Sequence, residues 1–183
     1  SNASFVGAFT SANLRLAGGS LFGDNTTPAV LGGQVVWTGG SFSGTWQVAS
    51  GQTLSAQDGS AKLFIGTNFT NAGTLRWDSD QNAGLLSSAI TNTGLFDLRS
   101  DADIAYAGGG PSTFTNAGVL RKSAGSGTSA VTNNIVFSNP GTVEALSGTL
   151  QFDGNLVNPG SVRGTATVQT ALLTNEGLVA PGD

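Results

Sequence analysis

The feature that most constrains this chain is a short motif that recurs six times between residue 69 and the C-terminus. It reads apolar, small polar, Asn, any residue, Gly, any residue, apolar, as in Phe69-Thr-Asn-Ala-Gly-Thr-Leu75. The copies centre on Asn71, Asn92, Asn116, Asn139, Asn158 and Asn175, so the spacings are 21, 24, 23, 19 and 17 residues. Self-similarity at such a period indicates a solenoid or another repeat architecture.

Each repeat predicts short strands joined by turns. Asn-x-Gly is typical of a turn, because Asn hydrogen-bonds nearby backbone and Gly adopts a positive φ without a steric penalty. The flanking runs of Val, Leu, Ile, Phe and Thr favour strands, and no window shows helical periodicity. A unit of this size buries an apolar face only by stacking on its neighbours. We therefore predict an all-β fold, a right-handed single-stranded parallel β-helix (β-solenoid) of about eight coils of 17–24 residues.

Stacking should align equivalent repeat positions in columns. The residues two before and four after each Asn are apolar in every copy, so both columns should point inward. The six Asn residues should form a ladder in which each side-chain amide donates to the next, which satisfies turn groups that would otherwise lack partners.

One further column carries alternating charge. The residues five after the first five Asn are, in order, Arg76, Asp97, Arg121, Glu144 and Arg163. They follow an inward residue by one position and should point outward. Opposite charges on stacked strands attract, so we predict an exposed salt-bridge ladder that sets the register, rather than a binding site.

The N-terminal part repeats less clearly. Residues 1–3 (Ser-Asn-Ala) resemble the remnant of a cleaved expression tag, and we expect the chain to be a segment of a longer protein. Residues 4–34 are expected to form an irregular coil or a cap, and residues 35–183 the β-helix repeats.

Composition excludes several chemistries. Only 10% of the 183 residues are charged, the net charge is −4, and the chain has no His and no Cys. These values exclude a zinc site built from His or Cys, a Cys nucleophile and a Ser-His-Asp triad, and they argue against nucleic-acid binding. No apolar stretch reaches the 18 residues of a transmembrane helix, so we expect no membrane insertion by this segment.

Acidic residues supply the only metal candidates. Asp80 and Asp101 occupy the same repeat offset, and with Asp103 they could contribute oxygen ligands to Ca²⁺. Their spacing matches neither an EF-hand nor the glycine-rich calcium repeat, so solvated turns are the favoured interpretation. We expect no resident cofactor.

The sequence offers residues for two other kinds of site. Asp97, Arg99 and Asp101 could be combined into a polysaccharide-cleaving site, but the expected pairing of the charges argues against it, and no catalytic residue is assigned. Trp37, Trp46, Trp77 and Tyr106 could stack on sugar rings, although aromatic residues in repeats more often pack in the core.

Three runs, at residues 96–103, 114–128 and 137–150, resemble the repeats of large secreted bacterial surface β-helix proteins, the stalks of adhesins and autotransporter-type passengers. The resemblance covers roughly residues 35–183. It implies a non-catalytic structural segment at the bacterial cell surface, with neighbouring repeats of its parent protein and host or matrix glycans or proteins as partners. A carbohydrate-binding module or a polysaccharide-degrading enzyme on the same fold are the alternatives.

Overall fold

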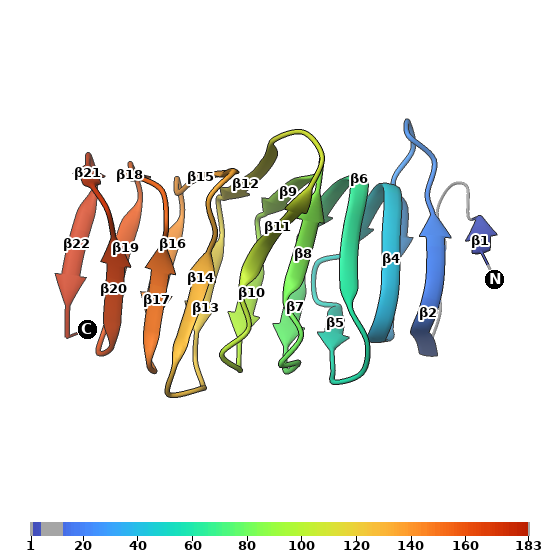
Figure 1. The fold of residues 1–183 in the computed structure, drawn as a ribbon, viewed down its shortest axis with the longest axis horizontal. Helices are drawn as coiled ribbons and strands as arrows, with labels where there is room; N and C mark the ends of the chain where they lie inside the picture. The colour runs from blue at the N-terminus through green and yellow to red at the C-terminus, as the bar shows by residue number, and fades with distance from the viewer. Residues whose placement is uncertain (1, 5–12, 183) are drawn as a thin grey trace.

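The chain folds into a β-solenoid of about eight turns, as predicted from the repeat. The structure is a computed structural model that describes residues 2–4 and 13–182. Every strand pairing among these residues is parallel, and the strands succeed one another along one long axis from the N-terminal to the C-terminal end (Figure 1). No helix long and apolar enough to span a membrane occurs in the part of the chain that the structure describes.

The strands form three parallel faces. The first face consists of β2 (Asn13–Phe22), β4 (Gln34–Val48), β5 (Thr53–Ala56), β7 (Thr74–Trp77), β10 (Leu95–Leu98), β13 (Val119–Lys122), β16 (Thr142–Ala145), β19 (Ser161–Gly164) and β22 (Leu178–Pro181). Both β2 and β4 are long and continue from this face onto the second.

The second face adds β1 (Asn2–Ser4), β6 (Lys62–Asn71), β8 (Ala83–Leu86), β11 (Ile104–Gly108), β14 (Thr128–Val131), β17 (Thr149–Phe152) and β20 (Thr167–Thr170). The third face comprises β3 (Ala29–Leu31), β9 (Ala89–Asn92), β12 (Ser112–Asn116), β15 (Ile135–Ser138), β18 (Leu156–Asn158) and β21 (Leu173–Asn175), together with the ends of β4 and β6.

The two predicted apolar columns point inward. Phe96 pairs in register with Leu75 on one side and Leu120 on the other, and all three are buried. The exception is the last coil, where Leu173 is 39% and Val179 40% exposed. This coil is paired on one side only, so nothing in the described chain covers its outer edge.

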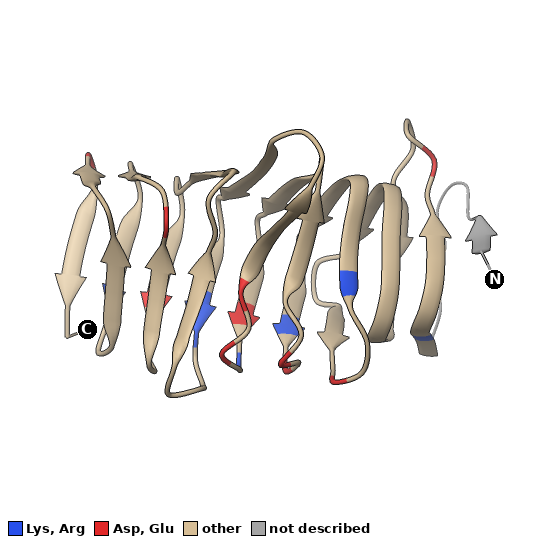
Figure 2. Cartoon of the chain, in the orientation of Figure 1, with Lys and Arg blue, Asp and Glu red and all other residues tan. Residues whose placement is uncertain are grey.

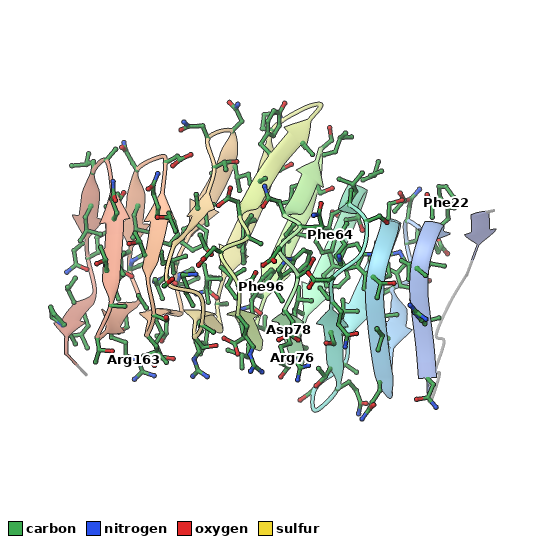
Figure 3. All side chains as sticks on the ribbon, turned by 60° about the horizontal axis from the view of Figure 1, so that its bottom comes forward. Phe22, Phe64, Arg76, Asp78, Phe96 and Arg163 are labelled. Carbon is green, nitrogen blue, oxygen red and sulfur yellow. The ribbon has the colours of Figure 1, made fainter. Side chains whose placement is uncertain are left out.

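Aromatic rings run through the interior as one connected series. Trp37 contacts Phe42, Phe64 and Trp77 with ring centroids 4.8, 5.2 and 5.7 Å apart. From Trp77 the contacts continue through Phe96, Phe114, Phe137 and Phe152, at separations of 4.7–6.2 Å. Figure 3 shows Phe64 and Phe96 between the faces. Aromatic pairs at such distances stabilise a core beyond the area they bury.

The motif glycines are needed for a different reason than the one predicted. None of those in the six Asn-x-Gly turns has a positive φ. Instead, a Cβ on Gly94 would collide with the carbonyl oxygen of Gly73 in the preceding coil, and a Cβ on Gly118 with that of Gly94. The same carbonyls accept the backbone N–H groups of Leu95 and Val119 at 2.9 and 2.8 Å. Close approach of stacked turns therefore excludes a side chain.

The N-terminal part joins the parallel sheet with breaks in its register. β2 pairs with β4 from Asn13 opposite Gln34, with register shifts between Leu16 and Ser20, which is compatible with the irregular coil that the sequence leaves open for this part. Of the remainder of the expected cap, residues 5–12 lie outside the described residues. β1 includes Asn2 and Ala3, two of the presumed tag residues, and pairs with the end of β2.

Candidate functional site

The six motif asparagines form a hydrogen-bonded ladder on the inner side of the third face. Nδ2 of each residue donates to Oδ1 of the next, at 2.7–2.8 Å in all five steps from Asn71 to Asn175. The first five side chains are fully buried. The predicted ladder is therefore present, and it runs through the interior of the repeat.

Each of the first five ladder amides also holds the turn of the following coil. The second Nδ2 hydrogen of Asn71 goes to the carbonyl oxygen of Leu95 at 2.8 Å, and that of Asn116 to the carbonyl oxygen of Thr142 at 2.8 Å. At the start of the ladder, Oδ1 of Asn71 is buried without a donor, because the residue stacked on it in the preceding coil is Val48.

The first face carries the charged column in the predicted register. Asp97 pairs with Arg76 and Arg121, and Glu144 with Arg121 and Arg163. All five arginines of the chain lie on this face or directly after its strands, and Figure 2 shows most of the charged residues along the lower part of the solenoid, with a few acidic residues at its top.

The ion pairs do not follow the column throughout, which corrects the predicted ladder. Glu144 is bound on both sides, by Nε of Arg121 and by Nε of Arg163 at 3.1 Å, and it is buried rather than exposed. Arg76 turns instead to Asp78, at 2.5 Å (Figure 3). Asp97 has no ion pair within the described ranges, and its buried Oδ1 has no hydrogen-bond donor.

Asp78 explains why Arg76 and Asp97 form no ion pair although they are neighbours in the column. It directly follows β7 and lies beside the column, where it accepts Nε of Arg76 and faces Nε of Arg99 at 3.5 Å. A nearby carboxylate in the same coil thus competes with Asp97 for the guanidinium of Arg76. Asp78 occupies a different repeat offset from the charged column, so the repeat alone does not predict this neighbour.

Both lysines of the chain are fully buried, and sequence reasoning missed them. Nζ of Lys122 donates to the carbonyl oxygens of Ser100 and Ala124, to Oδ1 of Asp101 at 2.8 Å and to Oγ of Ser129. The available signal was strand alternation, because Lys122 pairs in register with the inward residue Leu98.

Lys62 lies in the same corner of the solenoid with fewer partners. Its Nζ donates to the carbonyl oxygen of Ser60 at 3.2 Å and to Oγ of Ser79 at 3.0 Å. Burial lowers the pKa of Lys62, and the charge of Asp58 offsets this only in part. Between the two lysines, Oγ of Ser100 donates to the carbonyl oxygen of Ser79 at 2.6 Å.

The calcium candidates are engaged by the backbone and by lysine. Oδ1 of Asp101 accepts from Nζ of Lys122 and from the backbone N–H of Gly127, and these bonds, the lysine first, lower the pKa of Asp101. Oδ1 of Asp103 accepts the backbone N–H of Ala130 at 2.8 Å, while Asp80 is exposed. No three acidic side chains converge in the part of the chain that the structure describes.

The aromatic candidates for sugar stacking lie in the core. Trp37, Trp46 and Trp77 are fully buried, so the hypothesis that they present rings to a ligand is wrong. Tyr106 is half-buried, and its hydroxyl donates to the carbonyl oxygen of Gly109 at 2.5 Å. The structure also separates the charged trio, since Arg99 faces Asp78 while Asp101 binds Lys122.

The first face also contains a polar hollow that the repeat motif did not indicate. A depression of about 480 Å³ lies among Gln34, Gln52, Gln57 and Arg76, and a second of about 330 Å³ adjoins it at Arg15. Both are lined by Gln34 and Gln57, so they form one continuous trough over the N-terminal coils. The signal in the sequence was three glutamines, Gln34, Gln52 and Gln57, in a part of the chain where the Asn-x-Gly motif is absent.

Comparison with known proteins gives this chain no relative. No protein-family model matches it, and no significant match is found among curated proteins or among solved structures.

Proposed function

We propose that this chain is a non-catalytic segment of a stalk on an exported bacterial surface protein, and that it supplies length and stiffness for presentation or adhesion. The observation that carries the proposal is the uninterrupted Asn ladder through six consecutive coils, in register with parallel strand pairing on all faces. A coil tied to its neighbours by buried side-chain bonds and by backbone bonds resists bending and stretching.

Length can be tested by removing whole coils. Deletion of residues 95–141 joins Gly94 to Thr142, so the Asn column continues from Asn92 to Asn158 and Arg76 is followed by Glu144. Because each coil adds about 4.8 Å, small-angle scattering should show a folded particle shorter by about 10 Å. A collapsed or unfolded product would contradict a modular stalk.

Location can be tested on cells that produce the full protein. An antibody raised against this chain should label intact cells, and external protease should remove the signal. Labelling that requires permeabilised cells would overturn a surface role.

A further inference from the structure

The trough on the first face offers hydrogen-bonding groups that the protein does not use. Arg15 and Gln34 are exposed and have no hydrogen bond or ion pair to any residue in the described ranges. Arg76 is held by Asp78 through Nε alone, which leaves its two terminal nitrogens directed to no described acceptor. Oε1 of Gln52 accepts from Gly33 at 2.7 Å, so its amide nitrogen remains available.

The strand register sets the distance between the two guanidinium groups. Arg15 pairs with Val36, Val36 with Ser55 and Ser55 with Arg76, which places the arginines three strands apart in one column. At about 4.8 Å a strand, they are separated by about 14 Å along the solenoid axis. Between them the column carries Val36 and Ser55. Asp78 lies at the Arg76 end of the trough, where its Oδ2 accepts Nε of Arg76 and Oγ of Ser55, and Asp58 lies in the turn beyond, where it accepts the backbone N–H of Asp80.

We propose that this trough binds a linear acidic oligosaccharide along the solenoid axis. Guanidinium groups match carboxylates with two parallel hydrogen bonds, and the Gln amides between them can donate to and accept from sugar hydroxyls. The site uses no ring stacking, in keeping with the burial of all three tryptophans. It is independent of the stalk function, which needs only the stacked coils.

An acidic peptide fits this site less well. Extended peptides gain affinity from main-chain hydrogen bonds to an open sheet edge, but β4 is already paired on both sides, with β2 and with β5. A peptide laid across this face would find side chains and no free backbone.

The test is calorimetric titration of the full chain with oligogalacturonates of increasing length, at low salt. Binding should strengthen sharply once the oligomer spans about 14 Å and should weaken with added salt. Arg15→Gln should reduce affinity at least about tenfold, and Gln34→Glu, which changes charge without changing shape, should reduce it similarly. Neither side chain has a partner among residues 2–4 and 13–182, so both variants should keep the native circular dichroism spectrum.

The matched control is Arg163→Gln, on the same face but four coils beyond Arg76, which should leave affinity unchanged. The proposal is overturned by absence of binding, by equal affinity for a neutral oligosaccharide of the same length, by tighter binding of polyglutamate, or by affinity insensitive to Arg15→Gln. None of these outcomes alters the coil-deletion result, so the two proposals fail separately.

Discussion

At the scale of single residues, the amide ladder and the turn glycines are what hold one coil on the next. A buried amide that finds both a donor and an acceptor in its neighbours stabilises the stack, whereas one left unpaired costs about 1–3 kcal/mol. The ladder therefore has a fixed cost at its first member, the unpaired Oδ1 of Asn71, which more coils do not increase.

Asn116→Ala should be strongly destabilising. It removes the acceptor for Asn92, the donor for Asn139 and the bond to the carbonyl of Thr142. The expected loss is about 3 kcal/mol or more in urea denaturation. Asn175→Ala is the matched control, because that side chain is exposed at the end of the ladder and should lose about 1 kcal/mol or less. Equal losses would show that the ladder is not cooperative.

Asp97→Arg should lower the melting temperature, because it would place a positive charge between Arg76 and Arg121 and so make three in succession. Like charges on adjacent strands cost up to about 1 kcal/mol, or roughly 2–4 °C for a chain of this size. Asp97→Asn should cost less, since Asp97 makes no ion pair to lose. Scanning calorimetry of both variants checks this, and equal melting temperatures would contradict the repulsion.

At the scale of elements, each face of the solenoid carries a different set of polar side chains. The third face carries the buried Asn ladder, the first carries the arginines and the trough, and the corner after the first face contains the two buried lysines. Lys122 has a carboxylate and three neutral acceptors, whereas Lys62 has only neutral ones. A buried charge is tolerated when it is paired and fully hydrogen-bonded. Removing a partner of Lys122 should therefore destabilise the fold more than removing a partner of Lys62.

The corner should contribute to acid unfolding through Asp101. Its pKa is lowered in the fold, chiefly by Lys122, so the stabilisation is present above the unfolded pKa of about 3.9 and is lost as the pH falls through the folded value below it. Asp101→Asn should flatten the stability profile below about pH 4 and should be less stable at neutral pH, because Lys122 keeps only neutral acceptors.

Urea midpoints measured from neutral to acidic pH check this prediction. Asp80→Asn is the control, since Asp80 occupies the equivalent offset in the preceding coil but its carboxylate has no hydrogen bond or ion pair within the described ranges. A profile for Asp101→Asn that matches the unmodified chain would show that the ion pair is not formed.

At the scale of the whole molecule, the solenoid is regular along its length and unprotected at its C-terminal end. There the interior opens as an apolar cavity of about 250 Å³, lined among others by Leu156, Val168 and Leu173. Exposed apolar side chains and unpaired strand edges at one place promote association.

The chain should therefore self-associate at high concentration through this end. Leu173→Lys should shift sedimentation toward the monomer, because a charge there opposes burial of the end coil. Val136→Lys is the control, as Val136 is also exposed but lies on the lateral surface of β15. If both variants sediment like the unmodified chain, the end is not the contact.

The repeat alone determined the all-β solenoid, the inward columns, the Asn ladder and the register of the charges. These follow from a repeat that stacks on itself, where one offset in the sequence means one position in space. Three matters depended on tertiary structure: Asp78 taking Arg76 from Asp97, the burial of both lysines in one corner, and the trough between Arg15 and Arg76. In each, the residues that meet occupy different offsets or different coils, and only the folded path of the chain sets the distance between them.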